Sequence, residues 1–184
     1  MKTKAYKKAQ AAKSVVSVDS GNLQGLNDDL SLPWYVYCVP PAVLSIITFL
    51  FYFPSCHYDF QFDDIANITK YYDIRHNNLR DLFFSGPRWI GRWLNSIHYS
   101  MGKFDPYGYR LTNIIQHILI GVLIYVLFLI ALQGLKKQSF FKHNAFILAF
   151  LTSAFFMLHP VQTQTVSYVI QGKLEGVATF FIVL

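Results

Sequence analysis

Residues 114–135 read IIQHILIGVLIYVLFLIALQGL, and this stretch decides the class of fold. Apart from His117, it holds no acidic or basic side chain. A helix rises about 1.5 Å per residue, so a helix of this length crosses the roughly 30 Å hydrocarbon core of a bilayer. The stretch therefore predicts a membrane-spanning helix.

Three other apolar runs flank this span, at residues 34–53, at about 144–158 and at 174–184. A signal peptide is the alternative for the first run, but the run is too long, begins too late and lacks a small-residue cleavage site. The fourth run is too short to cross a bilayer as a helix, and the chain ends inside it. We therefore expect an N-terminal fragment, or a truncated copy, of a longer polytopic protein.

The composition agrees with a membrane protein. Hydrophobic residues make up 53% of the chain and charged residues 14%, against about 25% charged in soluble domains. Aromatic residues make up 17%, and the mean hydropathy is +0.31. These values exclude a disordered tail, a coiled coil and a disulfide scaffold, and they predict an all-α polytopic membrane protein.

The net charge of +6 does not indicate nucleic-acid binding, because the basic residues form no basic helix face. Five lysines lie in the polar tail, residues 1–33, and others lie in the connection from Lys136 to Lys142. Lysine-rich segments stay on the cytoplasmic side. We expect a cytoplasmic N-terminus, a membrane region at 34–184, and an outer loop at 54–113 that faces the periplasm or lumen.

The outer loop contains helical patterns. PRWIGRWLNSIHYSMG, residues 87–102, places apolar side chains at helical spacing with polar ones between them. This pattern predicts an amphipathic helix, either at the membrane interface or capping the helix bundle. Asn78 is a candidate cap for a second short helix, and residues 104–109, FDPYGY, predict a turn.

The adjacent carboxylates Asp63 and Asp64 are the first candidates for chemistry. Aromatic and apolar residues flank them in YDFQFDDIANI. Adjacent carboxylates repel each other, so one of them should have a raised pKa and could act as a general base on an acceptor hydroxyl. The alternative is a solvent-exposed helix cap.

Polar side chains also follow the outer ends of the spans. Asn113 and His117 share one face of the second span, and His159 and Gln164 follow the third. Polar groups at membrane depth usually face a cavity or the interior of a bundle. The topology therefore places these side chains with Asp63 and Asp64 at one membrane face, either as a site or as hydrogen bonds that lock the bundle.

No recognised spacing predicts a transition-metal site. A divalent cation that bridges a carboxylate and a lipid phosphate is the one cofactor that the acidic pair allows.

An ordered series of motifs gives the chain a family resemblance. The series is FQFDDIANI, LRDLFFSG, GRWLNSIHY, FDPYGYRLTNIIQHIL and LHPVQTQTVSYVIQGK. Over residues 58–184 the chain resembles the membrane region of GT-C-type glycosyltransferase-like proteins. More narrowly, it resembles bacterial polytopic proteins with C-terminal tetratricopeptide repeats, which are related to the transmembrane, tetratricopeptide-linked O-mannosyltransferases.

The resemblance implies a GT-C-like helix bundle in a bacterial inner membrane. It implies transfer of a sugar from a lipid donor, a polyprenyl-phosphate-linked sugar. The acceptor is a protein or a glycan, more specifically a protein hydroxyl, and the transfer takes place on the outer face. In such proteins an acidic residue of the first outer loop is the usual candidate for the base; it corresponds here to the Asp63-Asp64 pair, of which Asp63 is favoured. Arg92 matches an arginine that could meet a lipid phosphate.

Three further residues match family motifs. Asn113 and His117 match an Asn-x-x-x-His motif, and His159 matches a His-Pro turn.

The sequence also departs from the family pattern. Trp93 stands in place of a proline, and Gln164 stands where relatives often carry glutamate. Gly172 and Lys173 stand where an arginine after Gln171 is common. A glutamine cannot act as a general base, so Gln164 is a candidate for substrate binding only. Two hypotheses follow. The first is a lipid-dependent glycosyltransferase, and the second is a non-catalytic membrane anchor or scaffold module of a tetratricopeptide-repeat protein, or an inactive truncated copy.

Overall fold

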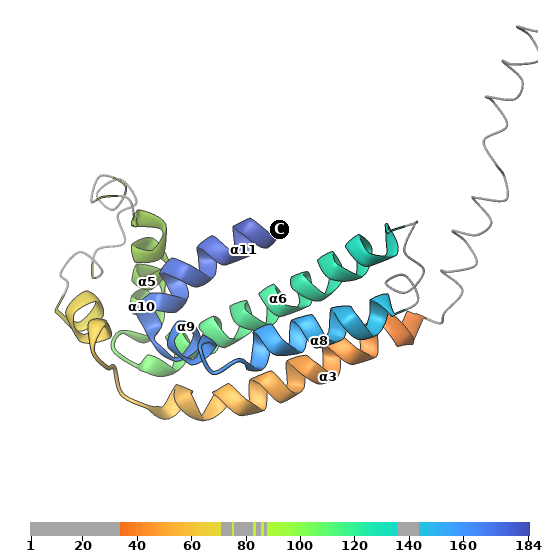
Figure 1. The fold of residues 1–184 in the computed structure, drawn as a ribbon. Coiled ribbons are helices and arrows are strands. Elements are labelled where there is room, and N and C mark those ends of the chain that lie inside the picture. Colours follow the sequence, from red (N-terminus) through yellow and green to blue (C-terminus); the bar gives the residue numbers. More distant parts are fainter. Residues whose placement is uncertain (1–33, 71–74, 76–82, 84–85, 87, 136–143) are drawn as a thin grey trace, which may run out of the picture. The chain divides into compact units, whose positions relative to one another are not determined.

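The computed structural model describes residues 34–70, 75, 83, 86, 88–135 and 144–184. The secondary structure assigned within these residues is helical, with no strand (Figure 1). The polar tail, the helix predicted after Asn78 and the lysine-rich connection lie outside the described residues. The chain divides into two units, Met1–Cys38 and Val39–Leu184, and every contact discussed below lies within the second unit.

The first apolar run forms α3 (Trp34–Tyr52), which continues into the short helix η1 (Phe53–His57). Leu44, Thr48 and Tyr52 recur every four residues and form the buried stripe of α3. The opposite face is apolar and exposed, with side chains that suit contact with lipid. These exposed residues are Val39, Val43, Ile46, Ile47, Leu50 and Phe51.

The second span forms α6 (Pro106–Gln133), which starts earlier than residue 114. Asp105 caps the helix because its carboxylate accepts a hydrogen bond from the Tyr107 amide at 3.0 Å. Pro106 occupies the first turn, where a missing N–H costs nothing. The predicted turn at residues 104–109 is therefore mostly the start of the helix.

Helix α8 (Ala145–Leu158) occupies the third predicted run and packs against α6. The two helices approach closely at Gly121, where an added Cβ would overlap Met157. Ser153 also donates a hydrogen bond to the Gly121 carbonyl at 2.8 Å. These are the small-residue and hydroxyl contacts that typically join membrane helices.

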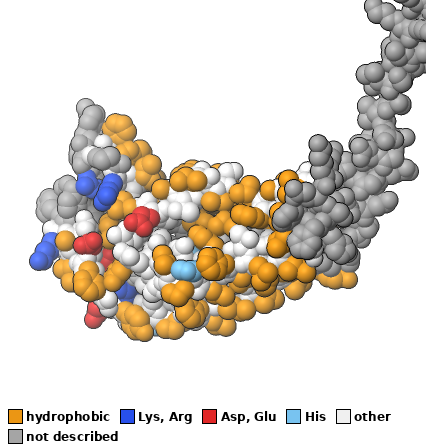
Figure 2. Space-filling view, viewed as in Figure 1, with side chains coloured by type: hydrophobic (Ala, Val, Ile, Leu, Met, Phe, Trp, Pro, Cys, Tyr) orange, Lys and Arg blue, Asp and Glu red, His pale blue; other side chains and the backbone are white. Residues whose placement is uncertain are grey.

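Two helical segments are long and apolar enough to span a membrane. One is Tyr37–His57, which consists of most of α3 and all of η1, and the other is Pro106–Gln133, which is α6. Helix α8 has 14 residues and is shorter than this. At about 1.5 Å per residue it reaches only about 21 Å. Figure 2 shows hydrophobic side chains along much of the visible face and charged side chains gathered towards one end.

Helix α5 (Trp89–Gly102) forms where the amphipathic pattern predicts a helix. Its fully buried residues are small or polar: Gly91, Asn95 and Ser96. An added Cβ at Gly91 would overlap the Leu174 side chain, so this face packs against the C-terminal helices.

The C-terminal part of the chain forms four short helical segments. They are α9 (Gln162–Ser167), α10 (Val169–Gln171), η4 (Gly172–Gly176) and α11 (Val177–Val183). The fourth predicted run thus lies in η4 and α11. Gly172 and Gly176 face α6, where an added Cβ would overlap the side chains of Asn113 and Gln116.

This glycine pair gives the first prediction. Gly172→Ala should destabilise the protein by about 1–3 kcal/mol, because the added methyl group meets a buried side chain that cannot move freely. Asn113 is held in place by hydrogen bonds to the carbonyls of Val166, Tyr168 and Val169. Thermal unfolding in bicelles measures the effect.

Gly108→Ala is the matched control, since a Cβ at this helical glycine has no neighbour within 4 Å. It should leave stability unchanged or raise it slightly, because alanine favours helix more than glycine does. Equal unfolding temperatures for the two variants would show that η4 does not pack closely on α6.

Candidate functional site

Arg110 joins the segments around the site. Its side chain is 2% exposed, although it carries a permanent positive charge. Its Nη1 atom donates a hydrogen bond to the Ser55 carbonyl at 2.9 Å, and Nη2 donates one to the Asp59 carbonyl at 2.5 Å. Its Nε atom donates to the Ser167 carbonyl at 3.0 Å. One guanidinium therefore fixes η1, the following loop and the end of α9 to the start of α6.

Asp64 is fully buried and caps a distant helix. Its carboxylate oxygens accept hydrogen bonds from the amides of Val169 at 3.2 Å and Ile170 at 2.9 Å, more than 100 residues further along the chain. These amides begin α10, where N–H groups have no partner within the helix. Asp64 thus attaches the first loop to the C-terminal helices.

Burial is the main influence on the Asp64 carboxyl, and it raises the pKa above the usual value. The hydrogen bonds from Ile170 and Val169 and the charge of Arg110 act in the opposite direction. The sequence predicts one raised pKa in this pair from carboxylate repulsion; the raised pKa of Asp64 instead comes from burial. Asp64 is indeed a helix cap, but it is buried and caps a helix far along the chain.

Asp63 differs from its neighbour because its side chain is exposed. Its carboxylate makes no hydrogen bond to another described residue, whereas its backbone carbonyl accepts one from Asn67. Phe62, directly before it, has φ of +47°, which is uncommon for a residue with a side chain. The strained backbone turns Asp63 outward while Asp64 points into the protein.

Four cavities lie next to one another around Asp63, since each shares lining residues with the next. The tyrosine cavity, of about 680 Å³, is lined by Tyr58, Gln61, Arg110, Pro160, Val161, Thr163, Gln164, Ser167 and Tyr168. The carboxylate cavity, of about 280 Å³, is lined by Phe62, Asp63, Gln164, Tyr168, Ile170 and Gln171.

The series continues on the other side of Asp63. The arginine cavity, of about 80 Å³, is lined by Asp63, Asn67, Arg88, Arg92, Ile170, Gln171 and Leu174. The apolar cavity, of about 450 Å³, is lined by Arg88, Ile90, Gly91, Gln171, Lys173, Leu174, Glu175, Val177, Ala178 and Phe181. Asp63 therefore lies between two regions. On one side are the carboxylate and tyrosine cavities, with side-chain amides and aromatic rings. On the other side is the arginine cavity, which leads to the apolar cavity.

The other predicted site residues divide into two groups. Asn113 and His117 are buried and bond to backbone: Asn113 as described above, and His117 through Nε2 to the Met157 carbonyl at 3.1 Å. The His117 ring also packs against Tyr52 and Phe156. These two side chains hold helices together and line none of the four cavities.

Arg92 and Gln164 do line the cavities, and Asp63 shares a cavity with each of them. His159 does not line these cavities. Its Nδ1 atom accepts a hydrogen bond from the Val161 amide at 3.2 Å, and its ring packs against Phe155. The structure therefore groups Asp63, Arg92 and Gln164, and it gives His159 a role at the turn after α8.

Lys173 is a buried cation, and the structure shows one hydrogen bond from its side chain, to the hydroxyl of Thr112. It is 3% exposed, and its Nζ atom donates to Thr112 Oγ1 at 2.5 Å. The same hydroxyl lies 3.2 Å from Nε2 of His98. Burial lowers the pKa of Lys173 to about 8. Burial, and next the charge of Lys173, lower the pKa of His98 to about 4.

Metal binding gains no support from the described residues. Among them, no three His, Cys, Asp or Glu side chains lie close enough together to hold an ion. The divalent cation that the acidic pair allows would have Asp63 as its exposed carboxylate, since Asp64 is engaged with two amides.

Comparison of the chain with protein-family models, with curated proteins and with solved structures found no match.

Sequence reasoning missed Arg110 and Lys173, which are the most deeply buried charged residues after Asp64 in the part of the chain that the structure describes. Arg110 lies four residues after Pro106 in an apolar segment, and a charge at the mouth of a predicted span was a usable signal. Lys173 was considered only as a departure from a family pattern. Its burial depends on the packing of η4 against α5 and α6, which no local pattern shows.

The lowered pKa of Lys173 gives the second prediction. The unfolded lysine titrates near 10.4, so the unfolded chain binds more protons than the folded chain between about pH 8 and pH 10.4. Stability should therefore rise with pH across this window, by at most about 1.4 kcal/mol per pH unit. Lys173→Met should remove this slope and stabilise the protein at pH 7.

Lys70→Met, at an exposed lysine, is the control and should retain the slope. A second measurement is the titration of His98 by NMR. Its pKa should rise in Lys173→Met, because one of the two causes that lower it is gone. An unchanged His98 pKa, together with an unchanged slope, would contradict a buried charge at Lys173.

Proposed function

We propose that the chain carries the reaction site of a GT-C-type, polyprenyl-phosphate-dependent membrane glycosyltransferase. The observation that carries the proposal is the position of Asp63, an exposed carboxylate that lines both the carboxylate cavity and the arginine cavity. A base at this point has open space on one side and two cations on the other.

The order of the cavities matches the parts of such a donor. The apolar side chains of Ile90, Val177 and Phe181 suit the first isoprene units of a polyprenyl chain. Arg88 and Arg92 suit the phosphate, because guanidinium groups bind phosphate oxygens in a bidentate way. The sugar then lies at Asp63, and the acceptor enters from the carboxylate and tyrosine cavities.

The reaction follows from these positions. The Asp63 carboxylate takes the proton of the acceptor hydroxyl while the hydroxyl oxygen forms a bond to the anomeric carbon. The bond between that carbon and the phosphate oxygen breaks, and its electron pair leaves with the polyprenyl phosphate. Arg88 and Arg92 stabilise the negative charge of the leaving phosphate. Asp64 acts as a positioning residue, since its hydrogen bonds fix the loop that carries Asp63.

The alternative is a non-catalytic membrane anchor. It is favoured by the fact that Asp64, Asn113 and His117 all bond to backbone groups that hold helices together. In this alternative the exposed carboxylate of Asp63 has no chemical task.

The third prediction separates the two functions. Asp63→Asn should lower sugar transfer from a polyprenyl-phosphate donor by about 10²–10⁴-fold, because the amide cannot accept the proton. The unfolding temperature should not change, since the side chain is exposed. Activity is assayed in membranes that contain the full open reading frame, with protein levels matched.

Asp64→Asn should instead lower stability by about 1–3 kcal/mol, because one buried amide of α10 loses its acceptor. Asp59→Asn is the control, as its exposed side chain lines none of the four cavities and the substitution keeps the backbone carbonyl that accepts a hydrogen bond from Arg110. Parental activity in Asp63→Asn would exclude the base and favour the anchor.

The fourth prediction concerns topology, for which we propose a multi-pass arrangement with a cytoplasmic N-terminus. The lysine-rich tail and connection carry this proposal. A reporter fused after Lys137 should read cytoplasmic, and one fused after Ser100 should read extracytoplasmic. The reverse pair of readings would place Asp63 on the cytoplasmic side and exclude transfer on the outer face.

A further inference from the structure

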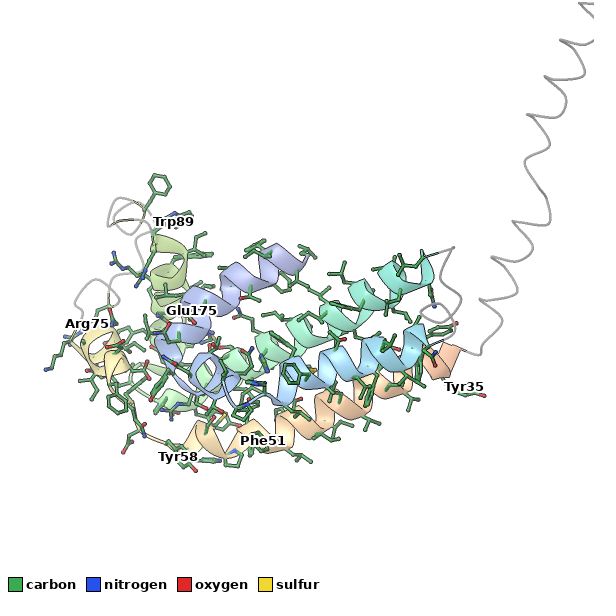
Figure 3. All side chains as sticks on the ribbon, viewed as in Figure 1. Tyr35, Phe51, Tyr58, Arg75, Trp89 and Glu175 are labelled. Carbon is green, nitrogen blue, oxygen red and sulfur yellow. The ribbon has the colours of Figure 1, made fainter. Side chains whose placement is uncertain are left out.

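Exposed aromatic rings surround the entrance on the acceptor side of Asp63. Tyr58 is 57% exposed and Phe62 is 76% exposed. The ring of Tyr168 meets Phe62 edge to face, with centroids 5.9 Å apart. Tyr58 lies in the loop after η1, as Figure 3 shows. Water-exposed rings at a cavity offer flat apolar surfaces to a ligand that has polar edges.

The backbone at Phe62 supports a role for its ring. A residue with φ of +47° costs free energy that neighbouring contacts must offset. The strained residue is not buried, so core packing does not account for its conformation. The strain instead places an aromatic ring and the Asp63 carboxylate on the wall of one cavity.

Side-chain amides supply the polar groups of the same two cavities. Gln61 and Gln164 line the tyrosine cavity, and Gln164 and Gln171 line the carboxylate cavity. None of the three amides hydrogen-bonds to another described residue. Each amide offers two donors and one acceptor. Sugar hydroxyls also donate and accept, so an amide can satisfy adjacent hydroxyls on one ring.

The charge of the tyrosine cavity favours a neutral ligand. Arg110 is the one charged residue in its lining, and its guanidinium is buried, donates to three carbonyls and interacts with the negative charge of Asp64. A peptide acceptor that binds as an added strand needs a strand edge, and the described residues contain no strand. The amides of Gln61 and Gln164 and several hydroxyl groups supply the polar lining of the cavity.

We infer that the tyrosine and carboxylate cavities form a binding subsite for a neutral saccharide, so that the acceptor hydroxyl belongs to a glycan. The rings of Tyr58, Phe62 and Tyr168 pack against the C–H face of a pyranose, and the amides bind its hydroxyls. The tyrosine cavity, at about 680 Å³, falls within the range of about 300–1,000 Å³ that small ligands occupy, and the adjoining carboxylate cavity adds about 280 Å³. The assignment of this ligand as the acceptor depends on the proposed function.

Binding without catalysis tests the subsite. The full open reading frame in phosphatidylcholine nanodiscs is titrated with maltose, mannobiose and N,N′-diacetylchitobiose, and saturation-transfer NMR detects contact with the pyranose C–H protons. At least one disaccharide should bind. Tyr58→Leu and Tyr168→Leu should each weaken binding about tenfold, which corresponds to about 1.4 kcal/mol, because leucine offers no flat ring face to the pyranose.

Conservative and distant variants separate recognition from folding. Tyr58→Phe and Tyr168→Phe keep the rings and should bind within about threefold of the parent. Tyr107→Leu alters a partly exposed tyrosine of α6 that lines none of the cavities, and it should bind like the parent. Equal loss in the Leu and Phe variants, or in Tyr107→Leu, would overturn ring recognition.

The remaining outcomes separate this inference from the proposed function. A serine- and threonine-containing peptide that binds with the same tyrosine dependence, while no disaccharide does, would overturn the saccharide subsite in favour of a protein acceptor. Binding of none of these probes would overturn it as well. Tyrosine-dependent disaccharide binding together with full activity of Asp63→Asn would retain the subsite and overturn the transferase.

Discussion

The buried guanidinium of Arg110 is the interaction on which the rest of the structure depends. A charge removed from water must be compensated, and here three backbone carbonyls from three segments do so. Those carbonyls belong to the end of η1, to the loop before Asp63 and to the end of α9. The requirement to solvate one cation thus brings together the chain segments that form the walls of the tyrosine cavity.

Asp64 completes this arrangement from the other side. Its carboxylate satisfies the first amides of α10, and Arg110 lies near enough for its charge to act on the carboxyl group. Asp64 is fixed inside by two amides, Phe62 before the pair has a positive φ, and the Asp63 side chain is exposed. The two adjacent carboxylates therefore have separate tasks, one in positioning the loop and one in the cavities.

The C-terminal helices reach this region because they carry glycines where they cross α6. Gly172 and Gly176 allow the backbone of η4 to approach Asn113 and Gln116. This approach also buries Lys173 beside Thr112, although no carboxylate of the described residues pairs with its charge. Burial of an uncompensated lysine costs stability, so the packing of η4 is stable in spite of Lys173 and not because of it.

The sequence by itself determined the helical class and the positions of the apolar helices. Length and hydrophobicity over residues 114–135 suffice for this, because a helix satisfies its own backbone and needs only an apolar surface. The pattern over residues 87–102 likewise determined α5. Asp63 and Gln164 were also predictable as candidates from their residue types and their place in the chain, whereas Arg92 was a candidate only through the family resemblance.

Only the tertiary structure decided what these residues do. It separated Asp63 from Asp64, and it turned Asn113 and His117 from site candidates into contacts between helices. It also gave Arg110 its central place. The physical reason is that burial and long-range hydrogen bonds set each role, and such bonds join residues more than 50 positions apart. No local pattern of hydrophobicity or charge encodes which distant carbonyl or amide a side chain will meet.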